Sequence, residues 1–129
     1  RWLVAEAGTY VATVIATKVS RGVTFVILDG GLNHLLAATD AFGRERPHPP
    51  LENLTRPEAP RTRVTVVGPL CTPLDVLGRD VELPRPEPGD RLAFRRVGAY
   101  GLSFSPSAFL GHPQPAERLD DGHDVLAEA

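Results

Sequence analysis

Alternating and β-branched apolar positions dominate the first quarter of the chain. Residues 10–20 (YVATVIATKVS) and 23–28 (VTFVIL) are two such runs, and β-branched side chains favour strands. Ser20–Gly22 between them is short enough for a tight turn, so the pattern predicts a β-hairpin. The sequence Asp29–Gly31 ends the second strand. The apolar stretch 32–38 fits a strand or a short helix, because its periodicity favours neither.

Three further runs predict strands in the second half of the chain. They cover residues 62–67, 79–83 and 90–97, and Gly or Pro residues border each of them. A last short strand is expected at 115–119. Between the two halves, residues 41–60 contain five prolines, which break regular structure. This stretch is therefore expected to be a long surface loop.

Many short strands with Gly and Pro turns, and no long amphipathic helix, predict an all-β domain. The expected architecture is an antiparallel Greek-key-like β-barrel or sandwich with a long Pro-rich loop. The length of 129 residues fits one domain. We expect this domain to cover residues 1–119 and the acidic residues 120–129 to form a frayed C-terminal tail.

The composition excludes several classes of function. Sixteen acidic and fourteen basic residues argue against a nucleic-acid or anionic-membrane surface. The single cysteine, Cys71, excludes an internal disulfide and a cysteine-rich zinc site, and it suits a reducing, cytoplasmic location. The four histidines lack metal-ligand spacing, so no metal is expected. Lys18 is the only lysine, so chemistry that needs a cofactor-bound lysine must use it or a lysine from another chain.

Four short motifs follow one another in the second half of the chain: Gly68–Cys71, Gly89-Asp90, Gly98–Tyr100 and His112–Glu117. Their order and spacing resemble the C-terminal β-domain of the diaminopimelate, ornithine and arginine decarboxylases, which depend on pyridoxal 5′-phosphate (PLP). The start of the chain resembles the segment that closes the family's PLP-holding barrel, so residues 1–8 are expected to be its remnant. The resemblance implies that the chain supplies part of an active site and cannot decarboxylate alone.

The resemblance also implies partners and a role for the single thiol. PLP is expected in the complete enzyme and not on this fragment, since the barrel domain of the parent chain holds it. The β-domain of one subunit is expected to complete the pocket of a second subunit in a homodimer. Cys71 matches the family cysteine that protonates the substrate α-carbon after CO₂ leaves. The alternative for a lone cysteine is an inert buried side chain.

Five other residues take their expected roles from the same resemblance. Tyr100 and Arg1 match residues that bind the PLP phosphate, Phe109 an aromatic residue that lines the pocket, and Asp75 an aspartate that supports the dimer contact. Thr72 departs from the family, because diaminopimelate and ornithine enzymes have an acidic residue there that holds the distal amine. A plain diamine-type substrate is therefore not expected. The Thr72 variant is more similar to relatives that act on carrier-linked or secondary-metabolite intermediates.

Two other functions stay open at this point. One is an amino-acid racemase of the related barrel-plus-β-domain type, although racemases of that type use a tyrosine as second base and the Gly68–Cys71 motif favours a decarboxylase. The other is a binding or regulatory module of the same fold without catalysis. In each case the missing barrel leaves an apolar interface exposed, which predicts a dimer or higher oligomer.

Overall fold

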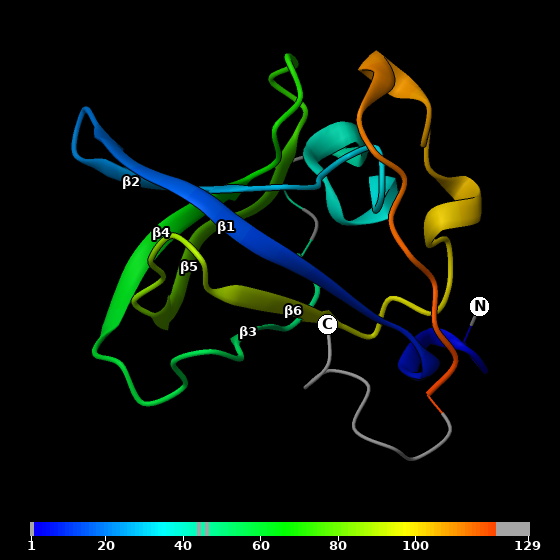
Figure 1. Ribbon diagram of the computed structural model, residues 1–129, viewed down its shortest axis with the longest axis horizontal. Coiled ribbons are helices and arrows are strands. Elements are labelled where there is room, and N and C mark those ends of the chain that lie inside the picture. Colours follow the sequence, from blue (N-terminus) through cyan, green and yellow to red (C-terminus); the bar gives the residue numbers. More distant parts are fainter. Residues whose placement is uncertain (1, 44, 46, 121–129) are drawn as a thin grey trace.

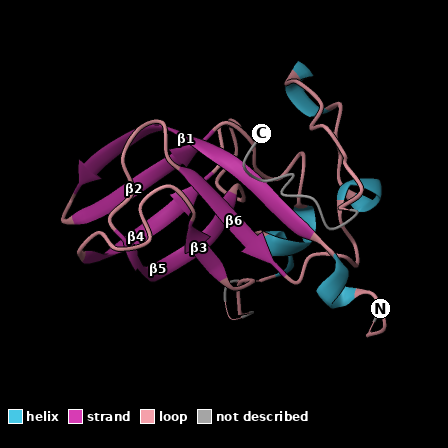
Figure 2. Cartoon of the chain, turned by 60° about the horizontal axis from the view of Figure 1, so that its bottom comes forward, coloured by secondary structure: helices cyan, strands magenta, loops and turns pink. Residues whose placement is uncertain are grey.

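Six strands form one mixed sheet in the computed structural model, which describes residues 2–43, 45 and 47–120. The strand order is β3-β6-β1-β2-β4-β5, and the edge strands β3 and β5 contact each other, so that the sheet curls into a nearly closed barrel (Figure 1). Short 3₁₀ turns lie on one side of the barrel (Figure 2). The strands are β1 (Thr9–Ser20), β2 (Val23–Leu28), β3 (Leu51–Asn53), β4 (Arg61–Val67), β5 (Val76–Pro84) and β6 (Arg91–Arg95). The 3₁₀ turns are η1 (Ala5–Ala7), η2 (Leu36–Ala38), η3 (Asp40–Phe42), η4 (Leu102–Phe104) and η5 (Phe109–Gly111).

Strand β1 is long because it serves both halves of the barrel. Its first half pairs with β6, and its second half pairs with β2. A bulge between Val14 and Ala16 marks the change of partner and leaves Ile15 53% exposed. Such bulges bend a strand sharply. The hairpin to β2 turns through Arg21 and Gly22, whose φ angles of 50° and 79° match the primed turns that suit twisted strands.

The barrel interior is filled by apolar side chains from every strand, and the short edge strand β3 contributes the partly buried Leu51. Burial of this surface is the main stabilising contribution to the domain. The apolar side chains with no more than 2% exposure are Val14, Val26, Leu28, Leu35, Val64, Val66, Leu77, Leu83, Leu92, Ala93 and Phe94.

The predicted hairpin is confirmed, and so are the strands that correspond to β4 and β6. Strand β5 begins at Val76, three residues before the predicted start. The ambiguous stretch 32–38 is a turn followed by η2. The barrel-like all-β class is confirmed as well. One of its ladders, β2 with β4, is parallel, and alternation within a strand carries no information on the direction of its partner.

Among the less regular segments, the loop prediction for residues 41–60 misses one short strand, and the prediction of a last strand is wrong. The proline-rich stretch 41–60 contains the strand β3, which pairs with β6 far away in the sequence; tertiary pairing overrides the weak local propensity of Leu51–Asn53. The strand expected at 115–119 is absent, since the described residues 112–120 join no ladder. Pro113 and Pro115 have no N–H to give one.

Some predictions fall outside the described residues. They concern Arg1 and most of the tail, residues 121–129. In the described part of the chain, no helix has the length and hydrophobicity needed to cross a membrane.

Candidate functional site

Two loops leave the barrel at the same end. Strands β2 and β4 run parallel, and Ile27 is paired with Val67 near their last residues. The loops that follow them, residues 29–35 and 68–75, therefore start side by side, and Figure 1 shows the second rising from the barrel beside η2 and η3. The second of these loops carries Cys71, and we refer to residues 68–75 as the Cys71 loop.

The Cys71 loop is a compact turn that presents its thiol to the outside. The Gly68 N–H donates to the carbonyl of Asp75 at 3.0 Å, and the Asp75 N–H donates to the carbonyl of Thr72 at 3.2 Å. These bonds close the loop on itself, and Cys71 is exposed at its tip. The hydroxyl of Thr72 accepts the Leu74 N–H at 3.3 Å, so this side chain also shapes the loop. An exposed thiol in a fixed loop is able to give up a proton.

The buried side chain of Asp75 fixes the Cys71 loop to the neighbouring loop. It is only 3% exposed, and its carboxylate accepts the N–H of Leu32 at 2.6 Å and that of Leu70 at 2.8 Å. Burial raises the pKa of Asp75 above its ordinary value, although both N–H groups and the nearby His34 and His112 act in the opposite direction. Because the side chain points into its own chain, any interface role acts through the loop that it holds.

Glycines leave the room for this carboxylate. A Cβ atom on Gly31 would lie 2.2 Å from Oδ1 of Asp75, and one on Gly68 would lie 2.3 Å from Oδ2. Both distances are far inside van der Waals contact. The Gly68 of the Gly68–Cys71 motif is thus required by the packing of Asp75.

Tyr100 lies on the turn after β6, in a left-handed conformation with φ of 53°. Tyr100 is 50% exposed. Its ring meets that of Phe104 edge-on with the ring centroids 5.2 Å apart, and the Phe104 ring stacks on that of Phe42 with the centroids 5.9 Å apart. These three rings form an exposed aromatic patch. Phe109 follows in η5 and is 42% exposed, so neither Tyr100 nor Phe109 is a core residue.

The start of the chain packs against this turn. The Gly98 N–H donates to the carbonyl of Ala5 at 3.1 Å. A Cβ atom on Gly98 would lie 2.0 Å from the carbonyl oxygen of Val4, so only glycine allows the contact. The residues that follow Arg1 therefore lie beside the segment that carries Tyr100. Arg1 itself stays a prediction.

A turn that the sequence did not single out joins the two parts of the site. Leu32 binds Asp75 of the Cys71 loop. Two residues later, Nε2 of His34 lies 2.9 Å from the carbonyl of Pro113, and the Leu36 N–H donates to Ser105 Oγ at 3.0 Å. The only sequence signal for this turn was the pair of glycines before Leu32, which permits close packing.

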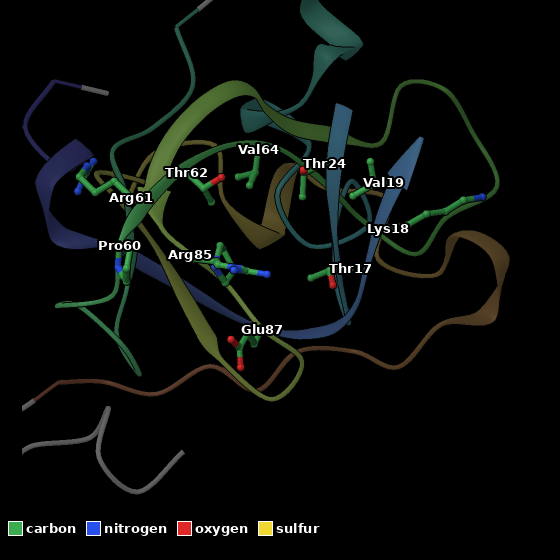
Figure 3. A pocket seen from close by; sticks show the side chains of 11 residues that line it. Thr17, Lys18, Val19, Thr24, Pro60, Arg61, Thr62, Val64, Arg85 and Glu87 are labelled. Carbon is green, nitrogen blue, oxygen red and sulfur yellow. The ribbon is translucent and has the colours of Figure 1, made fainter. Parts of the chain in front are cut away.

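A cavity of about 400 Å³ lies at the opposite end of the barrel, where β2 and β4 begin. Figure 3 shows the Arg85 side chain pointing into the opening, whereas Lys18 Nζ points away from it. Lys18 is exposed on β1, and it lies far from the Cys71 loop along the strands. We therefore place the candidate site at the Cys71 end. The cavity is lined by Thr17, Lys18, Val19, Thr24, Pro60, Arg61, Thr62, Val64, Arg85, Pro86 and Glu87.

Comparison with known families identifies this arrangement. Residues 2–98 match the family model described as the C-terminal sheet domain of pyridoxal-dependent decarboxylases. The match covers the barrel, the Cys71 loop and the start of the turn that carries Tyr100.

Individual relatives agree with the family model. The chain is 47% identical over 123 residues to the L-glutamyl-(BtrI acyl-carrier protein) decarboxylase of Niallia circulans, covering 92% of this chain and 29% of the relative. It is 37% identical to the diaminopimelate decarboxylase of Deinococcus radiodurans, covering 96% and 31%. Among solved structures, diaminopimelate decarboxylase from M. jannaschii in complex with L-lysine is similar with a TM-score of 0.76 and 34% identity, covering 88% of this chain and 25% of that chain. The chain thus spans less than a third of the length of each of these relatives.

Proposed function

The chain belongs to the pyridoxal-dependent decarboxylases as their C-terminal sheet domain, and from this we propose that it completes the active site of a longer amino-acid decarboxylase. The observation that carries the proposal is the exposed thiol of Cys71 on a loop that the buried Asp75 fixes in place. The chain acts as one half of a site, and the other half lies on the barrel domain of the parent chain and on a second subunit.

The described residues of this chain are suited to complete a PLP site whose lysine lies on another domain. PLP, when bound, withdraws electrons from the substrate α-carbon so that CO₂ can leave. The only lysine, Lys18, is exposed at the end of this β-barrel that is remote from the Cys71 loop. The lysine that binds PLP covalently must therefore come from the PLP-holding barrel domain of the parent chain. Tyr100 offers a phenolic hydroxyl, and Gly98 and Gly101 on either side of it permit close approach. We propose that Tyr100, together with Arg1, binds the phosphate.

Cys71 supplies the proton that completes the reaction. When CO₂ has left, the α-carbon takes the proton of the Cys71 thiol through a new C–H bond, and the sulfur keeps the electron pair of the S–H bond as a thiolate. Solvent then returns a proton to the exposed sulfur. Because the Cys71 loop is closed by its own hydrogen bonds, the thiol is held in place for this step.

Thr72 and Phe109 are proposed to contact the rest of the substrate. Thr72 brings a neutral hydroxyl, which pairs poorly with a distal ammonium group. A substrate whose far end is an acyl link to a carrier carries no such charge. The 47% identity to a decarboxylase named for a glutamyl-carrier-protein substrate supports an amino acid bound to a carrier protein as the substrate.

The exposed apolar side chains of this domain support the proposed partners. They include the aromatic patch (Phe42, Tyr100 and Phe104) and, at the start of the chain, Trp2 and Leu3, which are 86% and 84% exposed. Such a surface is suited to burial against the parent barrel domain, for which residues 1–8 are the connecting segment, and against a second subunit in a homodimer. The single free cysteine supports a cytoplasmic location.

The test uses the full-length parent enzyme and follows CO₂ release from an aminoacyl carrier protein and from free diaminopimelate. We expect Cys71→Ala to lower kcat by about 100-fold, with the free energy of unfolding unchanged because the side chain is exposed. The isolated chain is expected to bind no PLP and to release no CO₂. An unchanged kcat in Cys71→Ala contradicts the proton-donor role, and faster turnover of diaminopimelate than of the carrier-linked substrate contradicts the substrate class.

A further inference from the structure

Two hydrogen bonds of His34 connect Tyr10 on β1 with the backbone at Pro113. The hydroxyl of Tyr10 lies 2.9 Å from His34 Nδ1, and His34 Nε2 lies 2.9 Å from the carbonyl oxygen of Pro113. A carbonyl oxygen only accepts, so Nε2 is the donor in this hydrogen bond. In the imidazole with one proton, Nδ1 accepts from the Tyr10 hydroxyl. Both ring nitrogens thus have a partner of the matching kind.

Tyr10 is fixed firmly enough to orient the imidazole. Its ring packs against that of Phe94, with the ring centroids 5.6 Å apart, and Phe94 is fully buried in the core. A Cβ atom on Gly30 would lie 2.2 Å from both the Tyr10 hydroxyl and His34 Nδ1, so the pair fills its space completely. Burial raises the pKa of Tyr10 above its ordinary value, and the carboxylates of Asp29 and Asp75 add to this rise. The hydroxyl therefore stays protonated and remains a donor.

His34 stands between the two segments of the site. On one side, the backbone of Leu32 holds Asp75 and with it the Cys71 loop. On the other side, Pro113 belongs to a loop that carries Phe109, and Gln114 Nε2 closes this loop by donating to the carbonyl of Ser107 at 3.0 Å. The imidazole is therefore a link between the Phe109 loop (residues 107–114) and the Cys71 loop.

We propose that His34 is a positioning residue, which holds the Phe109 loop at a fixed place relative to Cys71 and thereby sets the affinity for the substrate. The inference rests on the proposed function, in which Phe109 lines the substrate site and Cys71 donates the proton. The contact between Leu32 and Asp75 uses a backbone N–H. Loss of the imidazole thus releases the Phe109 loop and leaves the Cys71 loop in place.

The test compares His34→Gln with His34→Asn in the full-length parent enzyme. The amide nitrogen of Gln reaches about as far as Nε2, whereas that of Asn reaches only as far as Nδ1. We expect His34→Asn to raise KM about fivefold, as the loss of one hydrogen bond does, with kcat nearly unchanged. His34→Gln is expected to restore KM to within about twofold of the wild type.

Two measurements besides activity complete the test. Amide hydrogen exchange of residues 105–114 is expected to be faster in His34→Asn and unchanged in His34→Gln. The rate at which iodoacetamide alkylates Cys71 is expected to stay the same in both variants.

Wild-type exchange and wild-type KM in His34→Asn overturn the proposal. So does altered alkylation of Cys71 in both variants, since His34 would then support the fold in general. In a parent enzyme that releases no CO₂ the proposed function fails, and the exchange comparison alone decides whether His34 holds the loop.

Discussion

Asp75 and Asp90 are exposed to solvent to the same small degree, 3% of each, but their surroundings act on them in opposite directions. Burial raises the pKa of both carboxyls. At Asp90, hydrogen bonds from Arg56, from the Glu87 N–H and from Asn53 outweigh burial, and the pKa lies below its ordinary value. At Asp75, the hydrogen bonds from two backbone N–H groups do not outweigh the effect of burial, and the pKa lies above its ordinary value.

Asp75 lies deeper among protein atoms than Asp90, and the two carboxylates also receive different partners. Arg56 donates from Nε to both oxygens of Asp90 at 3.1 Å, and Asn53 Nδ2 donates to Oδ2 at 3.0 Å. These bonds tie β3 to the turn before β6, a region that we refer to as the Asp90 corner. The side chain of Asp75 instead binds two backbone N–H groups. Asp90, which has charged and polar side-chain partners, thus supports only the fold. Asp75, whose carboxylate has only backbone partners, supports the loop that carries the thiol.

The largest expected effect tests the Asp90 corner. Asp90→Ala removes the acceptor from Asn53, from the Glu87 N–H and from Arg56, so we expect the free energy of unfolding to fall by about 2 to 3 kcal/mol. Urea denaturation of the chain measures this. The exposed Glu58→Ala is the control, with an expected change of under about 0.5 kcal/mol. Equal losses of unfolding free energy in Asp90→Ala and Glu58→Ala would contradict the comparison, because the hydrogen bonds of the Asp90 corner would then not stabilise the fold.

The next effect concerns the space around Asp75. Gly68→Ala places a methyl group against the Asp75 carboxylate, and we expect a loss of about 2 kcal/mol. In a chain that already carries Asp75→Ala, the same substitution is expected to cost much less, because the clashing atoms are gone. Urea denaturation of the two single variants and the double variant gives this coupling. Additive losses would show that Gly68 is needed for another reason.

The smallest effect follows from the opposite pKa directions. The ionised form of Asp90 stabilises the fold above the ordinary value of 3.8, and this contribution is lost as the pH falls through the lower folded pKa. The contribution of Asp75 is present below 3.8 and is lost as the pH rises through the higher folded pKa. On acidification, the stability of the wild type relative to Asp90→Asn should therefore fall, and its stability relative to Asp75→Asn should rise. Urea denaturation from pH 3 to pH 7 measures both, and parallel curves for the two pairs would contradict the comparison.

The parts of this fold that depend on neighbours in the sequence were predictable. The β1–β2 hairpin follows from two β-branched runs around a tight turn, and the end of β4 follows from Gly68-Pro69. These features need information from only a few residues. The resemblance to the decarboxylases also depended on short motifs of this kind.

The features that depend on distant partners were not predictable. Strand β3 is three residues long and exists because it pairs with β6. His34 has one partner in β1 and the other at Pro113, and nothing near it in the sequence indicates either. The burial of Asp75 was unexpected for a similar reason, since an aspartate is normally exposed unless the fold supplies its partners.

The strand order has a consequence for how the chain acquires its structure. Only the hairpins β1–β2 and β4–β5 join neighbouring strands, whereas β6 enters the sheet between β1 and β3 and pairs Thr9 with Arg95. Contacts between such distant residues slow folding, because a long loop must close before they form. During synthesis, the open edge of β1 must wait until β6 has left the ribosome. Until then, this unpaired edge is open to wrong pairing.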